Sequence, residues 1–251
     1  MDIKNFRDLT LIEISDDTIF VISCDSCGGV GEKSEDIVNT SVDIVGYFTA
    51  KVALAEILAV GARPITLVDT LSVEMNDTGK RILEGVKRAL GEINIDQDIA
   101  VTGSTEENFH TIQTGIGVTV IGVMHKDDFR KTVAEDGAVI VVAGEPLMGQ
   151  EILENSDKIV SLNDILTLKQ ASEVLEILPV GSKGILNELK TMAKDAGLEF
   201  TLNQDIGIDI NKSAGPASCI ILAVRPECVD NIKQSVSIPV NEIGRFLGGK
   251  K

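Results

Sequence analysis

Histidine, aromatic residues and long apolar runs are all scarce in this sequence. Its 251 residues include two His, seven Phe, one Tyr and no Trp. With so few aromatic rings, a surface of stacked aromatics for single-stranded nucleic acid is not expected. Because His110 and His125 are the only histidines, histidine-based catalytic triads and multi-histidine metal sites are nearly excluded. The core must be aliphatic, and any chemistry must come from other side chains.

The sequence also lacks segments that direct a chain into a membrane. Its first ten residues, MDIKNFRDLT, do not have the basic and apolar architecture of a signal peptide. No apolar run reaches the roughly 20 residues that span a bilayer, because Glu56, Arg63 and Asp69 interrupt the best candidates. The four cysteines suit free thiols in a reducing compartment. We therefore expect a cytoplasmic protein with no membrane partner.

Positive charge is in short supply too. Lys and Arg number 23 against 39 Asp and Glu, which gives a formal net charge of −16. Such a chain repels the phosphate backbone of nucleic acids, so nucleic acid is not an expected partner. An acidic protein that handles phosphates needs a divalent cation to bridge its carboxylates to them. An acidic surface that serves solubility is the alternative, and composition leaves both open.

Length and pattern together predict two α/β domains. The 251 residues suit two modest domains, and a polar stretch at 125–136 divides them, so we place the domains at 1–125 and 126–251. Periodicity predicts strands, helices and a restart of the pattern after the polar stretch. The expected strands are 9–14, 18–24, 65–75, 98–102, 115–124, 138–143, 218–224 and one from 237 onward; the expected helices are 41–62, 78–93, 161–178, 184–196 and 226–235.

The strongest candidate site is an acidic, glycine-rich loop. The sequence has no GxxxxGK[ST] phosphate loop, no GxGxxG at a strand-to-helix turn, no HExxH and no GxSxG. Instead, Asp25 follows an apolar strand and precedes the segment Gly28–Gly29–Val30–Gly31–Glu32–Lys33. Glycines let backbone amides approach phosphates, a strand-end carboxylate can hold Mg²⁺, and Lys33 can neutralise phosphate charge. An ordinary polar turn between a strand and a helix would have the same composition.

Two further segments carry candidate ligands. Glu56 lies inside an otherwise apolar helix, where a buried carboxylate is costly unless it is paired or binds a metal. A partner across a subunit interface would also satisfy it. The segment TGSTEEN at 102–108 follows a predicted strand and offers hydroxyls and carboxylates on a loop. It is either part of a site or a plain polar turn.

The order of these features resembles a known family. Asp8 in a leading strand, Asp25 before GVGEK, Glu56 within LAEILAVGARP, and TGSTEE at a strand end follow one another as in the family of aminoimidazole ribonucleotide synthetase, thiamine-monophosphate kinase, selenophosphate synthetase and the hydrogenase-maturation dehydratase. In the second half, Ser182–Lys183–Gly184 resembles the family's SDG, and AGPA at 214–217 stands in the place of GGEDYE. The resemblance thus extends over nearly the whole chain.

This resemblance implies an α/β (α+β) two-domain fold. Its N-terminal domain would have a mixed or antiparallel sheet with helices, bind ATP with Mg²⁺ and form a homodimer; its C-terminal domain would be α/β. The implied catalytic residues are Asp25 and Lys33. The implied metal ligands are Asp8, Asp25, Glu56 and Glu106, and the implied phosphate contacts are Gly28, Gly29, Val30, Gly31, Lys33, Ser104 and Thr105.

Departures from the family pattern narrow the expected activity. Ser104 stands where relatives have a carboxylate or His, so Glu106 would supply that ligand or the ligand would be lost. The segments DLTLI, CDSCGGVGEK and TGSTEEN are similar to the α-ribazole kinases of cobamide salvage in Gram-positive bacteria. That similarity implies phosphoryl transfer from ATP to a ribosyl-azole alcohol, a small-molecule substrate. The alternatives are thiamine-monophosphate kinase, an ATP-dependent cyclo-ligase, and a nucleotide-binding dimer without catalysis.

Overall fold

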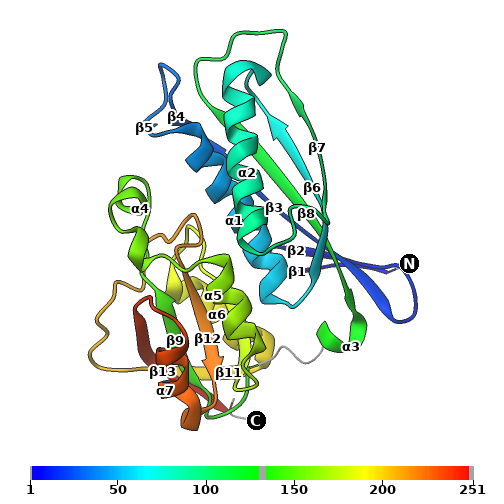
Figure 1. Ribbon diagram of the computed structural model, residues 1–251. Coiled ribbons are helices and arrows are strands. Elements are labelled where there is room, and N and C mark those ends of the chain that lie inside the picture. Colours follow the sequence, from blue (N-terminus) through cyan, green and yellow to red (C-terminus); the bar gives the residue numbers. More distant parts are fainter. Residues whose placement is uncertain (1, 130–133, 249–251) are drawn as a thin grey trace. The chain divides into compact units, whose positions relative to one another are not determined.

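The chain folds into two compact units. A computed structural model describes residues 2–129 and 134–248 (Figure 1). The first unit contains residues up to Ile57 together with Ala62–His125; the second contains Leu58–Gly61 together with the chain from Lys126 onward. Each unit has its own sheet and is described separately.

The first unit is built on a mixed six-stranded sheet. Its order is β1-β2-β3-β8-β6-β7, in which β6 and β7 run parallel and the other neighbours pair antiparallel. The strand β8 therefore lies between the N-terminal hairpin and the parallel pair. The strands are β1 Ile3–Phe6, β2 Leu9–Glu13, β3 Thr18–Gly28, β6 Arg63–Leu71, β7 Ala100–Thr105 and β8 Gly115–His125.

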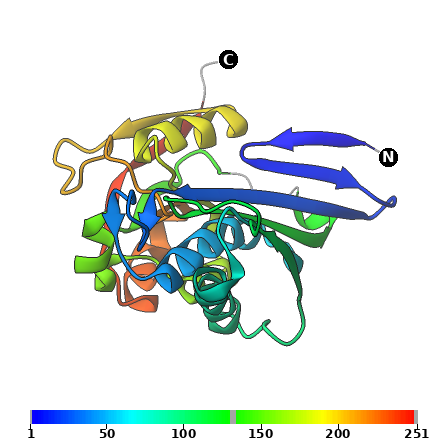
Figure 2. The ribbon, with the colours of Figure 1, turned by 90° about the horizontal axis from the view of Figure 1, so that it is seen from above.

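Two helices cover one side of this sheet (Figures 1 and 2). Helix α1 spans Val42–Ala59, and α2 spans Lys80–Glu92 after a π-helical turn at Met75–Gly79. The helices approach closely through glycines: a Cβ on Gly46 would lie 2.1 Å from the carbonyl oxygen of Ile82, and one on Gly85 would lie 1.9 Å from that of Asp43. Any side chain at these positions would push the helices apart.

The two faces of the sheet differ in burial. On the helix side, Val21, Leu67 and Val120 are fully buried. On the opposite side the apolar side chains are half-buried; they are Ile12, Phe20, Ile22, Val68, Ile121 and Val123. Alternation along each strand produces this division, because successive residues point to opposite faces.

The second unit is an antiparallel five-stranded sheet with helices on both sides. Its order is β10-β12-β9-β13-β11, and β9 and β12 are buried at every position. Ile140 and Val142 belong to the core that includes Leu189 and Met192 of α6; α5 and α7 lie on the other side (Figure 2). The strands are β9 Val139–Gly144, β10 Val174–Pro179, β11 Leu198–Leu202, β12 Cys219–Val224 and β13 Val240–Gly248; the helices are α3 Lys126–Phe129, α4 Gln150–Glu154, α5 Leu162–Gln170, α6 Ile185–Ala196 and α7 Val229–Ser235.

The predicted fold class is confirmed, with local corrections. The expected helix over 161–178 is wrong: α5 starts at a capping box of Ser161 and Asp164 and ends at Gln170, and β10 follows, paired to β12. The helical spacing of apolar residues continues past Gln170, but cross-strand pairing overrides it. Asp8 lies in the two-residue turn between β1 and β2, not in a strand, because Phe6 pairs with Leu9. Strands β1 and β11 were not anticipated.

No helix within residues 2–129 and 134–248 combines the length and the apolar character needed to cross a membrane.

Candidate functional site

Three strand ends and one strand start meet at a single end of the first unit's sheet. Strands β3, β6 and β7 finish there, and β8 begins there. Gly28 at the end of β3 pairs with Gly115 at the start of β8. Leu71 at the end of β6 pairs with Ile116 of β8 on one side and with Thr105 at the end of β7 on the other. The loops that leave these strands therefore gather at one place. This is the end that carries Asp25, the glycine-rich loop and the 102–108 segment.

Asp25 and Asp69 lie in one row across the sheet. Asp25 on β3 pairs with Val118 on β8, and Val118 pairs on its other side with Asp69 on β6. Directly opposed residues of antiparallel strands point to the same face. The two carboxylates therefore flank Val118 on the helix-covered side, one strand away from it in each direction.

A glycine makes room for Asp69. A Cβ on Gly103, the neighbour of Asp69 on β7, would lie 2.2–2.4 Å from the carboxylate atoms of Asp69. The glycine of the TGSTEE segment thus leaves space that the Asp69 carboxylate fills. Asp69 was not among the predicted site residues. Its signal in the sequence was an acidic residue inside an apolar strand, and only the pairing of β6 with β8 connects it to Asp25.

Burial makes both carboxylates harder to ionise. It raises the pKa of Asp25 to about 6, and it raises the pKa of Asp69 as well, where only 4% of the residue is exposed. A backbone hydrogen bond, from Ser26 for Asp25 and from its own backbone for Asp69, offsets only part of this effect. Within residues 2–129 and 134–248, neither carboxylate has an ion-pair partner. Desolvated carboxylates without a cation partner at strand ends are typical of functional sites.

Lys33 is held by an ion pair at the same end of the sheet. Its Nζ lies 2.8 Å from Oε2 of Glu74, and the hydroxyl of Thr78 donates to the other oxygen of that carboxylate. Burial opposes the ionisation of Glu74, but these two hydrogen bonds outweigh it and lower its pKa to about 2. Lys33 therefore already has a carboxylate partner that a phosphate group would have to replace.

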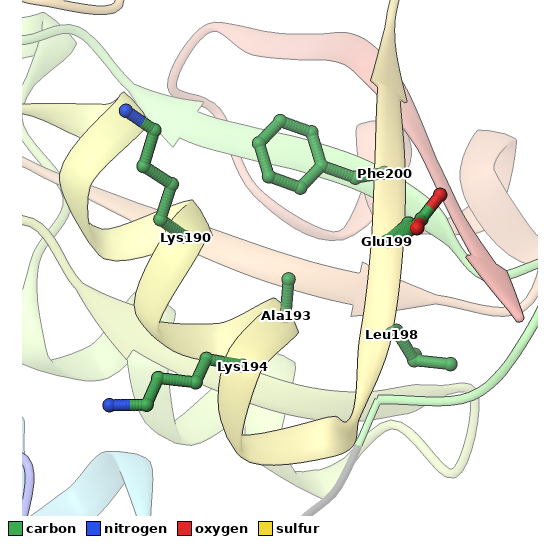
Figure 3. Close-up of a pocket in the computed structure, with 6 residues that line it drawn as sticks. All are labelled: Lys190, Ala193, Lys194, Leu198, Glu199 and Phe200. Carbon is green, nitrogen blue, oxygen red and sulfur yellow. The ribbon is translucent and has the colours of Figure 1, made fainter. Parts of the chain in front are cut away.

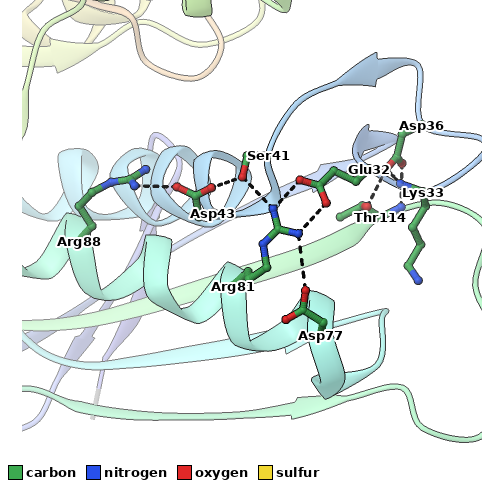
Figure 4. Close-up of polar contacts among 9 residues, drawn as sticks. All are labelled: Glu32, Lys33, Asp36, Ser41, Asp43, Asp77, Arg81, Arg88 and Thr114. Atoms are coloured by element: carbon green, nitrogen blue, oxygen red, sulfur yellow. Dashed lines mark hydrogen bonds and ion pairs between the residues drawn. The ribbon is translucent and has the colours of Figure 1, made fainter.

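A second set of ion pairs joins the loop to the helices (Figure 4). Arg81 on α2 donates from both terminal nitrogens to the carboxylate of Glu32, at 2.5 and 2.6 Å, and also to the hydroxyl of Ser41 at 3.0 Å. The Ser41 hydroxyl donates to Asp43, which accepts from Arg88 at 2.7 Å. This bidentate geometry fixes the loop in position.

The glycine-rich loop is folded onto the start of β8. Asp36 accepts from the backbone N–H of Lys33 at 2.8 Å and from the N–H and hydroxyl of Thr114 at 2.8 and 2.7 Å (Figure 4). Gly29 donates its N–H to the Thr114 carbonyl. A Cβ on Gly31 would lie 2.4 Å from the Thr114 hydroxyl oxygen, so glycine is required there. The short strands β4 Val30–Gly31 and β5 Val38–Asn39 pair parallel within this loop.

The 102–108 segment is an ordered loop at the end of β7. Ser104 pairs with Thr70 on β6, and the Thr105 hydroxyl donates to Glu107 at 2.9 Å. Glu106 accepts from the backbone N–H groups that follow it, at 2.7 Å for Asn108. The structure thus brings Ser104 and Thr105 to the same sheet end as Asp25, while Glu106 serves its own loop.

The predicted metal ligands are not gathered into one cluster. Within residues 2–129 and 134–248, no three His, Cys, Asp or Glu side chains lie close enough to hold a metal ion together. Asp8 is exposed in the β1–β2 turn, and Glu56 is half-buried on α1, one turn past Ala53, whose carbonyl accepts from Ser23. Asp25 and Asp69 supply two hard oxygen donors, which fits Mg²⁺ because this ion is commonly held by one or two carboxylates together with substrate phosphates.

A groove in the second unit contains none of the predicted residues. It has a volume of about 410 Å³ and lies between α6 and β11, lined by Lys190, Ala193, Lys194, Leu198, Glu199 and Phe200 (Figure 3). It contains no buried carboxylates comparable to Asp25 and Asp69 of the first unit.

Comparison with known proteins finds a family model that matches the first unit. The family model described as "AIR synthase related protein, N-terminal domain" matches residues 7–124. This part of the chain is therefore similar to the N-terminal domain of AIR synthase related proteins. No curated protein sequence matches the chain significantly.

Solved structures extend this likeness beyond residues 7–124. Thiamine-monophosphate kinase from Stenotrophomonas maltophilia K279a is 18% identical with a TM-score of 0.64, over 99% of this chain and 90% of that chain. E. coli HypE, a hydrogenase maturation protein, is 12% identical with a TM-score of 0.65, over 91% and 80%. T. maritima PurL complexed with ATP is 14% identical with a TM-score of 0.62, over 95% of this chain, which spans 42% of PurL. At these identities the match establishes a shared fold, and the family model over residues 7–124 confirms the predicted family resemblance.

Proposed function

We propose that the protein is an ATP-dependent phosphotransferase that acts on a small-molecule alcohol. The observation that carries this proposal is the row of Asp25 and Asp69 beside the Lys33 loop, in a unit similar to the N-terminal domain of AIR synthase related proteins. The similar structures include enzymes solved with ATP or with AMPPCP and TMP. Two desolvated carboxylates and a lysine at one end of the sheet support the proposal, because a nucleoside triphosphate needs a bridging cation and a positive side chain.

In the proposed reaction, the acceptor hydroxyl oxygen forms a bond to the γ-phosphorus of ATP. The bond from that phosphorus to the β–γ bridging oxygen breaks, ADP leaves, and the hydroxyl proton is lost. That proton passes to solvent, because phosphoryl transfer needs no strong general base. Lys33 would exchange Glu74 for a phosphate oxygen and neutralise its charge. Catalysis rests mainly on positioning and charge neutralisation.

Asp25 and Asp69 are the residues we assign to a nucleotide-bound Mg²⁺. The ion would supply charge neutralisation at the β- and γ-phosphates. Glu56 and Asp8, which the family resemblance implies as ligands, stay proposals. Of the two, Glu56 is the better placed, because the neighbouring turn of α1 contacts Ser23 of β3 through a 2.6 Å hydrogen bond.

For the acceptor we retain the ribosyl-azole alcohol of the α-ribazole kinases as the first choice. The segments DLTLI, CDSCGGVGEK and TGSTEEN support it. Thiamine monophosphate is the second choice, supported by the match over 90% of thiamine-monophosphate kinase. A cyclo-ligase would release ADP and phosphate without phosphorylating an alcohol.

A direct assay tests the proposal. The purified protein is incubated with Mg²⁺-ATP and, separately, with α-ribazole, thiamine monophosphate or formylglycinamidine ribonucleotide, while ADP and product mass are followed. A mass gain of one phosphoryl group on an acceptor, lost in Asp69→Asn, is the expected result. Binding of ATP with every acceptor unchanged would instead favour the non-catalytic nucleotide-binding dimer.

A further inference from the structure

Asp36 holds both backbone groups of Lys33. Its carboxylate oxygen Oδ2 accepts from the N–H of Lys33 at 2.8 Å, and its own N–H donates to the carbonyl of Lys33 at 3.1 Å. Hydrogen bonds of this kind, from an Asp to backbone groups close to it in sequence, stabilise a local turn. The backbone of Lys33 is therefore fixed by a residue that the proposed function does not use.

The carboxylate of Asp36 also connects this turn to the sheet. Its Oδ1 accepts from the N–H of Thr114 at 2.8 Å, and its Oδ2 accepts from the Thr114 hydroxyl at 2.7 Å (Figure 4). Thr114 is 1% exposed and directly precedes β8, the strand that lies between β3 and β6. Because β3 carries Asp25 and β6 carries Asp69, Asp36 fixes the turn at Lys33 relative to these two strands.

The backbone and the side chain of Lys33 are held by different carboxylates. Its Nζ lies 2.8 Å from Glu74, whereas its N–H is bonded to Asp36. In Figure 4 the side chain of Lys33 extends away from the Asp36 carboxylate. A phosphate oxygen that replaces Glu74 would leave the bonds to Asp36 intact. The lysine can therefore change its partner by a movement of the side chain alone.

The partners of Asp36 distinguish it from the candidate metal ligands. Its carboxylate accepts from three donors, and it forms no ion pair within residues 2–129 and 134–248. Three donors occupy most of the hydrogen-bonding capacity of one carboxylate. Asp36 is thus suited to hold backbone in place, and Asp25 and Asp69 remain the groups available to a cation.

We propose that Asp36 is the residue that positions Lys33 for a nucleotide phosphate. It fixes the backbone of Lys33 beside β8, so that the lysine leaves Glu74 without a movement of the loop. This assignment rests on the proposed phosphotransferase function, in which Lys33 contacts ATP. Asp36 acts through Lys33 and contacts no reacting atom.

A double-mutant cycle tests whether Asp36 acts through Lys33. Binding of a non-hydrolysable ATP analogue with Mg²⁺ is measured by calorimetric titration in the native chain, Asp36→Asn, Lys33→Met and the double variant. We expect Asp36→Asn to raise the dissociation constant by about fivefold or more in the native background and by less than about twofold in Lys33→Met, because residues of one hydrogen-bond network are coupled. An equal loss in both backgrounds, or no loss in either, would overturn the proposal.

Glu35→Gln is the matched control for charge. It removes one negative charge from the same loop, and the side chain of Glu35 has no hydrogen bond or ion pair in the described part of the chain. We expect it to leave binding of the analogue unchanged or slightly tighter, because one repulsive charge is gone. A loss of affinity equal to that of Asp36→Asn would contradict the role of Asp36.

Thr114 offers a second test that leaves the charge unchanged. Thr114→Val removes the hydroxyl donor to Asp36, and Thr114→Ser keeps it. We expect Thr114→Val to weaken binding of the analogue and Thr114→Ser to retain it, with thermal unfolding showing that both variants are folded. Equal affinities of the two would overturn the proposal, also where Asp36→Asn does not fold.

The same titrations separate this assignment from the proposed function. A native chain that binds no ATP analogue would refute the proposed function and the assignment with it. Binding by the native chain without coupling between Asp36 and Lys33 would refute the assignment alone.

Discussion

At the residue scale, the shifted pKa of Asp25 separates its contribution to function from its contribution to stability. Because folding raises the pKa of Asp25, the folded state binds this proton more tightly than the unfolded state does. The resulting stabilisation is complete below about pH 4 and is lost as the pH rises through about 6. Asp25→Asn cannot ionise, so it should lose turnover and yet be more stable than the native chain at pH 8, by on the order of 2 kcal/mol. Thermal unfolding at pH 5.5 and 8 measures this, and the gain should be smaller at pH 5.5. Asp16→Asn, in the exposed β2–β3 turn, is the control; substantial activity in Asp25→Asn would contradict the assignment.

The Lys33–Glu74 ion pair predicts opposite effects of its two partners on nucleotide binding. Glu74→Gln removes the competitor for Lys33, so ATP analogues should bind more tightly, by about threefold to tenfold if the freed charge contributes about 1 kcal/mol. Lys33→Met should weaken binding instead. Calorimetric titration with a non-hydrolysable ATP analogue measures both, and equal effects in the two variants would exclude this exchange.

The contribution of the same ion pair to the stability of the fold decreases at low pH. Because the pKa of Glu74 is lowered to about 2, the pair stabilises the fold above the ordinary Glu pKa, and that contribution is lost as the pH falls from about 4.5 toward 2. Its worth is modest, since partly exposed pairs contribute up to about 1 kcal/mol.

At the element scale, the contact between α1 and α2 depends on two glycines. Gly46→Ala would place a methyl group 2.1 Å from a backbone oxygen of α2, so the helices must separate, and we expect destabilisation of about 1–3 kcal/mol or more. Gly91→Ala, also on α2, meets nothing within 4 Å and should be neutral or stabilising by up to about 1 kcal/mol. Urea unfolding of the three proteins measures the difference. Equal midpoints would show that the helices can shift at no cost.

Elements whose pattern is self-contained were predictable from the sequence, and elements that depend on a distant partner were not. Helix α1 and strand β8 were expected because their apolar spacing and a terminal Gly61 are local signals. Strand β10 was mistaken for helix because its pairing with β12 is formed by residues some 45 positions later. Asp69 was missed for the same reason: its link to Asp25 exists through Val118, on a strand between them. Asp8 was misplaced because a two-residue turn has little signal in a polar segment.

At the scale of the whole molecule, the predicted homodimer stays a proposal that the outer sheet face can test. Ile22 and Ile121 pair across β3 and β8 on the face opposite the helices, and both are half-buried. If two copies associate through this face, Ile121→Glu should give a folded monomer, because a charge buried at an interface is costly. Sedimentation at micromolar concentration measures this, with Ile14→Glu as the control. A monomeric native chain, or a dimer that survives Ile121→Glu, would show that this face is not the interface.

In each sheet, the strand that is synthesised last lies between strands that are synthesised earlier, and this has a consequence for biosynthesis. In the first unit, β8 joins the β1-β2-β3 ribbon to the β6-β7 pair, and in the second unit β13 joins β11 to β9. A chain that emerges from the ribosome in order therefore has two unjoined halves of a sheet until residues 115–125 are available, and an unpaired β11 until residues 240–248 follow. Each unit must hold its open strand edges in solution while synthesis continues, a period in which unpaired edges invite association between nascent chains. The timing of translation through these two short stretches thus bears on how much of the protein reaches its native state.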